Sequence, residues 1–289
     1  MIKGTQEQEN IWNAIENTED HVFVSAGAGC GKTFTIVEGA NRLPQNTKAA
    51  FLAFNKSIAT ELQERLPDNV EAKTFHAFGF AAIRGAGVRT KVNNFKVNNI
   101  VKELLGKDFH IPPVKKLVSL VKGSLVDAKD IKSLHRLIGE YNINFHSERE
   151  MNIVIEAMPA LLTMCKTQTH LIDFDDMVWL PLVNNYPLPR YDILFVDEAQ
   201  DFNESQRELI MRSVGNGRCI IVGDKNQAIY GFRGADSNSI AMFHQRLSKG
   251  ERKISDFPLS ITWRCPVSVV KEANRYVPEL KYHEDAING

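Results

Sequence analysis

The sequence predicts an α/β protein in which a parallel β-sheet is interrupted by a mostly helical insert. Short, continuously apolar runs alternate with segments of helical periodicity, which is typical of strands that helices cover on both faces. From about residue 85 to about residue 170 the apolar residues recur only at helical spacing. Strand-like runs then return, so we expect one sheet that is built from two separate parts of the chain.

The elements before the insert follow one another closely. Residues 5–18 place Ile11, Trp12 and Ile15 on one face of a helix, and apolar strands then alternate with helices. Pro44 and Pro67 end two of these helices, because proline cannot continue the hydrogen-bond ladder of a helix. We expect strands at 22–25, 49–54 and 70–74, and helices at 33–43, 57–66 and 75–83.

The insert begins after the turn-forming run Gly85-Ala86-Gly87. Three segments within it show helical spacing, and strand-like runs resume beyond it. We therefore expect residues 1–84 and 171–289 to form one domain, and residues 85–170 to form a helical domain inserted into it. The segments with helical spacing are 114–121, 134–138 and 153–162, and the later strands are 192–196 and 218–222.

The composition is that of an ordinary folded protein, with 43% hydrophobic residues, 24% charged residues and a formal net charge of zero. No overall basic field therefore points to a nucleic-acid partner. The charge is uneven, because residues 84–170 hold 14 Lys and Arg against 8 Asp and Glu. This local surplus fits either the solvated surface of helices or a track for a polyanion.

The cysteines and the apolar runs bear on the location of the protein. The four cysteines lack the paired spacing of a zinc site or a disulfide framework, which favours a reduced, intracellular setting. No run of about 18 apolar residues is present, so no membrane span is predicted. We expect a cytoplasmic protein, and a nuclear location is also compatible with these observations.

A glycine-rich segment at residues 25–33 follows the apolar run at residues 21–24. Glycines let the backbone point its N–H groups at phosphate oxygens, and the N-terminus of the following helix favours an anion. Lys32 would reach the β- and γ-phosphates of a nucleoside triphosphate, and the Thr33 hydroxyl would bind its magnesium. A glycine-rich turn without function is the alternative. The predicted phosphate loop consists of Ala26, Gly27, Gly29, Gly31, Lys32 and Thr33.

An acidic pair, Asp197-Glu198, follows the apolar residues 193–196. The carboxyl ends of parallel strands are the places where α/β sheets bind their ligands. Asp197 would hold magnesium, and Glu198 would orient or deprotonate the attacking water. The alternative is an acidic pair on the surface without a ligand.

A third strand with a polar end, residues 219–224, leads toward Gln227. A glutamine beside the γ-phosphate can sense its presence, and an aromatic side chain shortly after it can stack on a base. Tyr230 and Phe232 are placed for this role, whereas aromatic residues in isolation more often belong to a core.

Together these segments resemble the motifs of the UvrD/Rep-type superfamily 1A DNA helicases. The resemblance is strongest to the branch that includes the F-box DNA helicases and related phage and bacterial proteins. It covers nearly the whole chain outside the insert and applies to the N-terminal motor half of those proteins. It implies a RecA-like P-loop NTPase fold that uses ATP and Mg²⁺. The segments that carry it are 5–8, 26–33, 53–59, 73–78, 172–177, 197–201, 223–235 and 259–266.

The resemblance also implies roles for single residues. Gln8 and Trp263 would bracket the adenine, Arg264 would contact the γ-phosphate, and Gln227 would couple ATP to DNA. The family moves 3′ to 5′ along single-stranded DNA, so the same polarity is implied here. Catalytic roles fall to Lys32, Glu198, Gln227 and Arg264. The residues implied to contact DNA are Phe54, Asn55, His76, Tyr230, Phe232 and Arg233, with Phe232 at a position that the family often fills with tryptophan.

Family members continue into a second RecA-like domain, whereas this sequence ends at Gly289. That domain supplies an arginine, and such an arginine accelerates phosphoryl transfer by about 10³–10⁵-fold. We therefore expect this chain alone to bind ATP·Mg weakly and unwind little, and to need a second motor domain or a partner protein. An alternative is a non-catalytic module that binds ATP or single-stranded DNA. A small-molecule kinase would explain the phosphate loop but not residues 197–201, 227–235 and 263–264.

Overall fold

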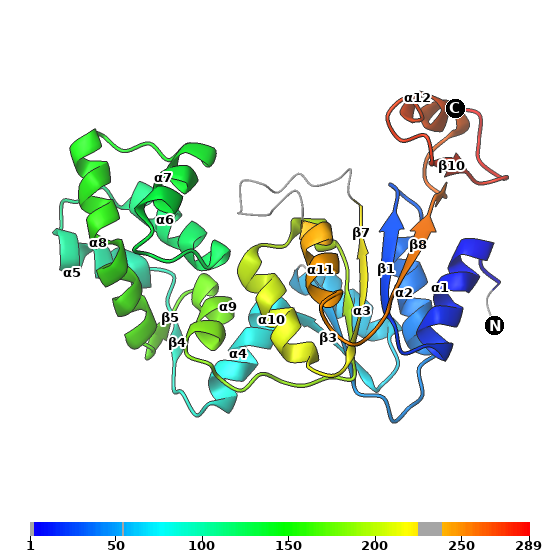
Figure 1. Ribbon diagram of the computed structural model, residues 1–289, viewed down its shortest axis with the longest axis horizontal. Helices are drawn as coiled ribbons and strands as arrows, with labels where there is room; N and C mark the ends of the chain where they lie inside the picture. The colour runs from blue at the N-terminus through cyan, green and yellow to red at the C-terminus, as the bar shows by residue number, and fades with distance from the viewer. Residues whose placement is uncertain (1–2, 54, 225–238) are drawn as a thin grey trace.

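The computed structural model describes residues 3–53, 55–224 and 239–289. The strands of its main sheet are β1 (His21–Ala26), β2 (Ala49–Ala53), β3 (Val70–Thr74), β6 (Ile193–Val196), β7 (Arg218–Gly223) and β8 (Ile254–Leu259). They lie in the order β3-β2-β6-β7-β1-β8, and every neighbouring pair is parallel (Figure 1). The predicted α/β class with a parallel sheet is therefore confirmed.

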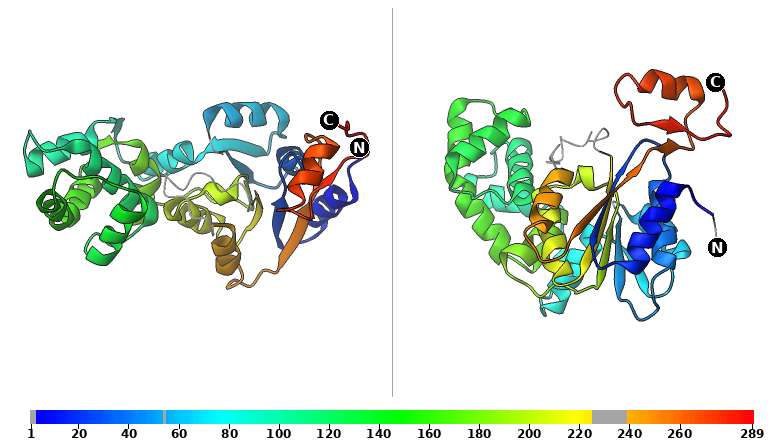
Figure 2. Two further views of the ribbon diagram at one scale, coloured as in Figure 1. Left: turned by 90° about the horizontal axis from the view of Figure 1, so that it is seen from above. Right: turned by 45° about the vertical axis from the view of Figure 1, so that its right-hand side comes forward.

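Helices cover both faces of this sheet, as Figure 2 shows. Alternate residues of a strand point to opposite faces, so Phe51 packs with one layer of helices and Leu52 with the other. Burial on both faces explains why the strands read as continuous apolar runs. One layer consists of α1 (Gln6–Asn17), α2 (Lys32–Asn41) and α3 (Lys56–Arg65), and the other of α4 (Phe75–Gly85), α9 (Phe174–Val183), α10 (Glu204–Val214) and α11 (Ser239–Leu247).

Strand β8 was not predicted from the sequence. Its residues Ser255 and Asp256 are polar, and Pro258 has no backbone N–H to donate to a neighbouring strand. These features are tolerated because β8 forms the edge of the sheet beside β1, and no strand of the described residues pairs with its other side. The sequence pattern of an edge strand is therefore weaker than that of the strands inside the sheet.

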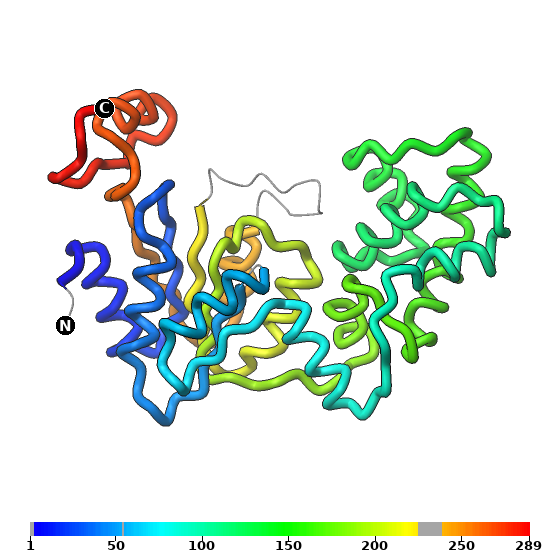
Figure 3. The backbone as a smooth tube through the Cα atoms, turned by 180° about the vertical axis from the view of Figure 1, so that it is seen from behind, coloured from blue at the N-terminus to red at the C-terminus, as the bar shows by residue number. Residues whose placement is uncertain are grey.

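Four helices form a bundle beside the sheet (Figures 1 and 3). They are α5 (Lys96–Leu105), α6 (Ile111–Ser124), α7 (Ile131–Glu140) and α8 (Glu148–Thr167). The last three contain the segments of predicted helical spacing. Two short strands, β4 (Lys91–Val92) and β5 (Leu171–Ile172), pair in parallel where the chain enters and leaves the bundle. In the described ranges, no helix combines the length and the apolar character that crossing a membrane requires.

Helix α9 contributes to the cores of both the bundle and the sheet. Its Met177 and Leu180 pack with the bundle, whereas its Val178 and Leu182 pack against the sheet. Helix α4 approaches α9 very closely, because a Cβ on Gly79 would lie only 1.9 Å from the Met177 carbonyl oxygen. The two cores therefore meet within α9, and the division of the chain near residues 85 and 170 stays a prediction.

A buried cluster of two lysines and two aspartates joins the bundle to α9. Lys96 Nζ lies 2.6 Å from Asp176 Oδ2, and Lys122 Nζ lies 3.0 Å from Asp173 Oδ2 and 2.8 Å from Asp176 Oδ1. Burial opposes the charged form of Lys122, but the neighbouring carboxylates, Asp173 foremost, outweigh it and raise the pKa of the ammonium group. Lys96 and Lys122 are 1% and 0% exposed, so neither adds to the basic surface that the sequence suggested.

The last part of the chain forms a small unit near the carboxyl ends of β1 and β8 (Figure 1). It contains β9 (Ile261–Thr262), α12 (Val267–Ala273) and β10 (Lys281–Tyr282), and its two strands pair in parallel. Leu280 packs into the core beneath α1 and α2, and a Cβ on Gly27 would lie 2.8 Å from Leu280 Cδ1. This unit therefore touches the segment that was predicted to bind phosphate.

A buried histidine at the start of β1 makes the stability of the fold depend on pH. The His21 side chain accepts a hydrogen bond at Nδ1 from the Cys219 backbone N–H, at 3.1 Å. Burial, together with the nearby Arg252 and Arg218, lowers the pKa of His21 to about 4. An unfolded histidine has a pKa of about 6.5. Between these values the unfolded chain binds a proton that the folded chain does not, so stability falls as the pH falls through this interval.

We expect His21→Gln to weaken this pH dependence. Glutamine can accept the same hydrogen bond without titrating, and the full contribution of one histidine is at most about 1.4 kcal/mol per pH unit. Denaturant unfolding at pH 7 and pH 4.5 measures the effect as a difference between the two proteins. The two proteins must be compared because Asp197 and Asp201 also titrate in this pH range. The pKa values of both are raised to about 6 in the folded protein, so these two residues increase its stability as the pH falls, whereas His21 decreases it. The prediction would be wrong if the free energy of unfolding changed by the same amount between pH 7 and pH 4.5 in both proteins.

Candidate active site

The ends of four neighbouring strands meet at one edge of the sheet. Because all strands are parallel, the carboxyl ends of β1, β6, β7 and β8 lie on the same side. Four loops therefore leave the sheet together, one from each strand. Their residues are 27–31, 197–198, 224 and 260–264, and they include most of the described residues that were predicted to bind the nucleotide.

The predicted phosphate loop turns from β1 into α2, which begins at Lys32. Gly29 and Gly31 adopt φ angles of +70° and +76°, a backbone region that glycine enters without steric cost. The loop is tied to the segment after β8, since Gly27 N–H donates to the Leu259 carbonyl at 2.9 Å and Gly29 accepts from Trp263 N–H at 3.0 Å. The loop thus stands at a helix N-terminus, where the backbone favours an anion.

The acidic pair after β6 contacts this loop directly. Lys32 Nζ lies 2.9 Å from Glu198 Oε2, and Thr33 Oγ1 donates to Asp197 Oδ2 at 2.9 Å. Burial and the neighbouring Glu198 raise the pKa of Asp197 to about 6. A hydroxyl and a buried carboxylate at this distance fit Mg²⁺, which takes one or two protein oxygens beside phosphates. A bound cation would also relieve the repulsion between the two carboxylates.

Glu198 is held in an uncommon backbone conformation by specific contacts. Its φ and ψ are 53° and 43°, and its backbone N–H donates to Asp197 Oδ1 at 2.8 Å. Gln200 Nε2 donates to Glu198 Oε2 at 2.8 Å, and Gln200 Oε1 accepts from the Asp224 N–H at 3.0 Å. A left-handed conformation at a non-glycine residue is costly and is concentrated at functional sites. Gln200, which the sequence analysis gave no role, therefore links the ends of β6 and β7.

A cavity of about 540 Å³ opens beside these residues. It is lined by Gly29, Cys30, Gly31, Lys32, Thr33, Phe34, Glu198, Trp263 and Arg264. This volume lies within the usual range for sites that bind nucleotide-sized ligands, about 300–1,000 Å³. Ala26 and Gly27 instead line a neighbouring cavity of about 230 Å³ together with Leu280.

The two residues predicted to bracket adenine have different surroundings. Gln8 is buried beneath the phosphate loop, where Oε1 accepts from the Thr5 N–H at 2.9 Å and Nε2 donates to Thr35 Oγ1 at 3.1 Å. Trp263 is 54% exposed and borders the cavity, and its ring stacks on His283 with centroids 3.8 Å apart. Thr35 and His283 could not be predicted as part of the site, because their contacts are made with distant residues.

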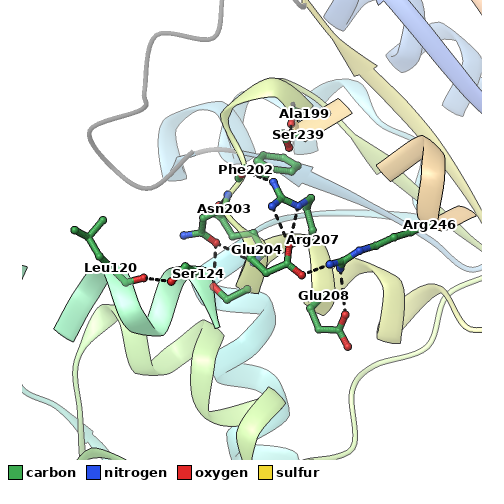
Figure 4. A network of polar contacts seen from close by, with 12 residues as sticks. Leu120, Ser124, Ala199, Phe202, Asn203, Glu204, Arg207, Glu208, Ser239 and Arg246 are labelled. Atoms are coloured by element: carbon green, nitrogen blue, oxygen red, sulfur yellow. Dashed lines mark hydrogen bonds and ion pairs between the residues drawn. The ribbon is translucent and has the colours of Figure 1, made fainter. Parts of the chain in front are cut away.

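A polar network, drawn in Figure 4, supports the segment that follows the acidic pair. Ser239 Oγ donates to the Ala199 carbonyl at 2.7 Å, and Arg207 Nη1 donates to the Phe202 carbonyl at 2.8 Å. Glu204 pairs with both Arg207 and Arg246. The network connects this segment to α10 and α11, so the position of Glu198 is coupled to two packed helices.

The structure describes two of the residues that were predicted to contact DNA. Asn55 begins α3 as its N-cap, with Oδ1 accepting from the Ile58 N–H at 2.9 Å, and it is exposed. His76 lies in the first turn of α4, and its ring packs nearly perpendicular to that of Phe174, with the ring centroids 5.4 Å apart. The other predicted DNA contacts lie outside the described residues, as does the predicted coupling residue Gln227; these contacts are Phe54, Tyr230, Phe232 and Arg233.

Comparison with known proteins places this site in a family. F-box DNA helicase protein 1 of Schizosaccharomyces pombe is 29% identical over 290 residues, which cover 93% of this chain and 32% of that protein. ATP-dependent DNA helicase Rep of Buchnera aphidicola is 27% identical over 92% of this chain and 44% of its own length. ATP-dependent DNA helicase PcrA of Staphylococcus aureus is 26% identical, over 91% of this chain and 39% of its own length.

This chain thus spans about a third to under half of the length of these curated relatives. Residues 7–248 match the family described as UvrD/REP helicase N-terminal domain. The match includes the phosphate loop, the acidic pair and the ends of β6 and β7. Since it covers well over half of the sequence, the chain belongs to the UvrD/REP helicase N-terminal domain family.

Proposed function

We propose that this chain is the ATP-binding motor part of a DNA helicase that moves 3′ to 5′ along single-stranded DNA. The observation that carries the proposal is the pairing of two distant motifs. Lys32 and Thr33 contact Glu198 and Asp197, which are 166 and 164 residues away, each at 2.9 Å. A triphosphate site needs a phosphate-binding lysine, a metal-binding pair of oxygens and a base, and these four residues supply all three.

The proposed roles follow from the positions of the side chains. Lys32 binds the β- and γ-phosphates, and their charge competes with Glu198 for the ammonium group. Glu198 is then free to orient or deprotonate the attacking water. Thr33 and Asp197 hold Mg²⁺, which supplies charge neutralisation at the phosphates when bound. Arg264, which borders the cavity, contacts the γ-phosphate, and the exposed ring of Trp263 stacks on adenine beside Gln8.

We also propose that the helical bundle is an inserted domain that helps to hold DNA. The basic surplus of residues 84–170 supports this role, although two of the lysines are buried and paired. The other 12 basic residues of this range still outnumber its 8 acidic ones, and positive side chains attract the phosphates of a nucleic acid. Asn55 and His76 on the motor, together with Phe54, Tyr230, Phe232 and Arg233, complete the proposed DNA path, and Gln227 couples it to ATP.

We expect Lys32→Ala to weaken the binding of a fluorescent ATP analogue by about 10–150-fold, because a hydrogen bond to a charged group contributes about 1.5–3 kcal/mol. Titration of the protein with the analogue and Mg²⁺ measures the dissociation constant directly. Lys249→Ala, which removes an exposed lysine after α11, serves as the matched control. Equal affinity in the wild-type and Lys32→Ala proteins would contradict the nucleotide site.

A further inference from the structure

The helical bundle contains two histidines and a glutamate whose metal-ligating atoms all lie within 4.8 Å of one another. His110 is the residue that precedes α6, His146 lies just before α8, and Glu150 lies in the first turn of α8. The two imidazole rings stack with their centroids 4.1 Å apart and their planes at 26°. The cluster shares no residue with the nucleotide cavity or with the buried lysine–aspartate cluster.

The glutamate of this cluster is fixed in its orientation. Glu150 Oε2 accepts from the backbone N–H of His146 at 2.6 Å, and the backbone N–H of Glu150 donates to Ser147 Oγ at 3.1 Å. The side chain of Glu150 is only 12% exposed. Its other oxygen, Oε1, is therefore aimed at the imidazole of His110. The hydrogen bonds of Glu150 also cap α8, and a carboxylate that ligates a metal is held by hydrogen bonds in the same way.

The imidazole of His110 presents a lone nitrogen to the same space. Nδ1 of His110 is buried and has no hydrogen-bond partner within the described part of the chain, which is costly for a polar atom. The distance from this nitrogen to Glu150 Oε1 is 3.9 Å, which is too long for a hydrogen bond. Two atoms that bind one zinc ion at about 2.0–2.2 Å each lie within about 4 Å of each other, so one ion can bridge this gap.

We propose that His110, His146 and Glu150 form a zinc site that joins the N-terminal end of α6 to that of α8. Two imidazole nitrogens and one carboxylate oxygen are a ligand set that suits Zn²⁺ and leaves a fourth position for water. Mg²⁺ and Ca²⁺ prefer oxygen ligands alone, so this site is distinct in its metal from the proposed ATP site. The bound ion replaces the stacking of a half-buried and an exposed imidazole by a cross-link between two segments of the bundle.

Isothermal titration of the chelator-treated, full-length chain with Zn²⁺ tests this site. We expect one ion to bind with a dissociation constant in the micromolar range or below, and the melting temperature to rise with zinc concentration. Co²⁺ in place of zinc should give visible absorption bands of a site with fewer than six ligands. His146→Ala and Glu150→Gln should each weaken zinc binding at least tenfold and abolish the cobalt bands.

The choice of variants separates ligand loss from unfolding. His146 is exposed, so its replacement by alanine leaves the core of the bundle unchanged, and Glu150→Gln keeps the size of the side chain. His135→Ala, which removes an exposed imidazole from α7 of the same bundle, should bind zinc like the wild-type protein. Zinc binding that is absent from the wild-type protein, or that both ligand variants retain with the affinity of the wild-type protein, would overturn the proposal. Absence of binding would mean that the three side chains only pack together at this place without holding a metal.

Discussion

Glu198→Gln is expected to lower the rate of ATP hydrolysis by about 10²–10⁴-fold, the usual contribution of a general base. Glutamine has the size of glutamate and can still accept the hydrogen bond from Gln200, but it cannot take a proton from water. Loss of its charge also removes the competitor of the phosphates for Lys32. The affinity for ATP should therefore stay the same or increase while turnover is lost.

Single-turnover hydrolysis, with protein in excess over radiolabelled ATP, measures this effect even if the chain alone turns over slowly. The assay is run with and without saturating single-stranded oligonucleotide, and affinity is measured separately with the fluorescent analogue. Glu251→Gln, at an exposed position before β8, is the matched control and should leave both quantities unchanged. A pure binding module would bind ATP or DNA without hydrolysis, so equal single-turnover rates in the wild-type and Glu198→Gln proteins would favour that alternative.

The candidate nucleotide site could be predicted because each of its motifs is local in the sequence. Each of its motifs directly follows an apolar strand, and parallel strands bring their carboxyl ends to one edge of a sheet. The order of the strands could not be predicted in the same way. Strand β7 lies between β1 and β6, so the separation of Lys32 from Glu198 depends on tertiary packing that no motif encodes. Edge strand β8 was missed for a related reason, since Pro258 weakens its pattern.

Residues that act through distant partners were the ones that the sequence did not reveal. Thr35 and Gln200 are ordinary polar residues until the fold brings Gln8 and Asp224 to them. The same applies to His110 and His146, which stack across a separation that no spacing rule covers. Cysteine spacing, which indicated no zinc site, gives no information about these histidines. Local sequence motifs thus predict the position of the candidate site. They do not predict which side chains hold that site in place.

The lysines of the bundle show why local charge is an incomplete guide. Lys96 and Lys122 counted toward the basic surplus of the insert, yet each is buried against a carboxylate of α9. Their partners lie 80 and 51 residues away, so the sequence alone could not distinguish them from solvated lysines. The cluster instead acts as a connection between the bundle and a helix that packs against the sheet.

Lys96→Met is therefore expected to destabilise the protein by about 3–5 kcal/mol, since removing one partner of a buried ion pair leaves an uncompensated charge. Lys96 Nζ donates to both Asp176 Oδ2 and the Cys165 carbonyl, each at 2.6 Å, and methionine can satisfy neither. With this lysine gone, Lys122 alone faces Asp173 and Asp176. Denaturant unfolding followed by circular dichroism gives the free energy of unfolding.

Two further variants distinguish the loss of charge balance from the loss of packing. Lys102→Met, at an exposed position on the same helix, should change the free energy of unfolding by less than about 0.5 kcal/mol. Adding Asp176→Asn to Lys96→Met restores neutrality, so the double variant should be more stable than the single one. With Asp176→Asn measured alone, the double-mutant cycle should give a coupling of about 0.5–3 kcal/mol between the two residues. If Lys96→Met cost no more than Lys102→Met, the buried cluster would not be what holds the bundle to α9. Asp176 also caps α9, because its side chain accepts a hydrogen bond from the Asp173 N–H. A double variant less stable than Lys96→Met would therefore show that hydrogen bonding by Asp176 contributes more to this connection than charge balance does.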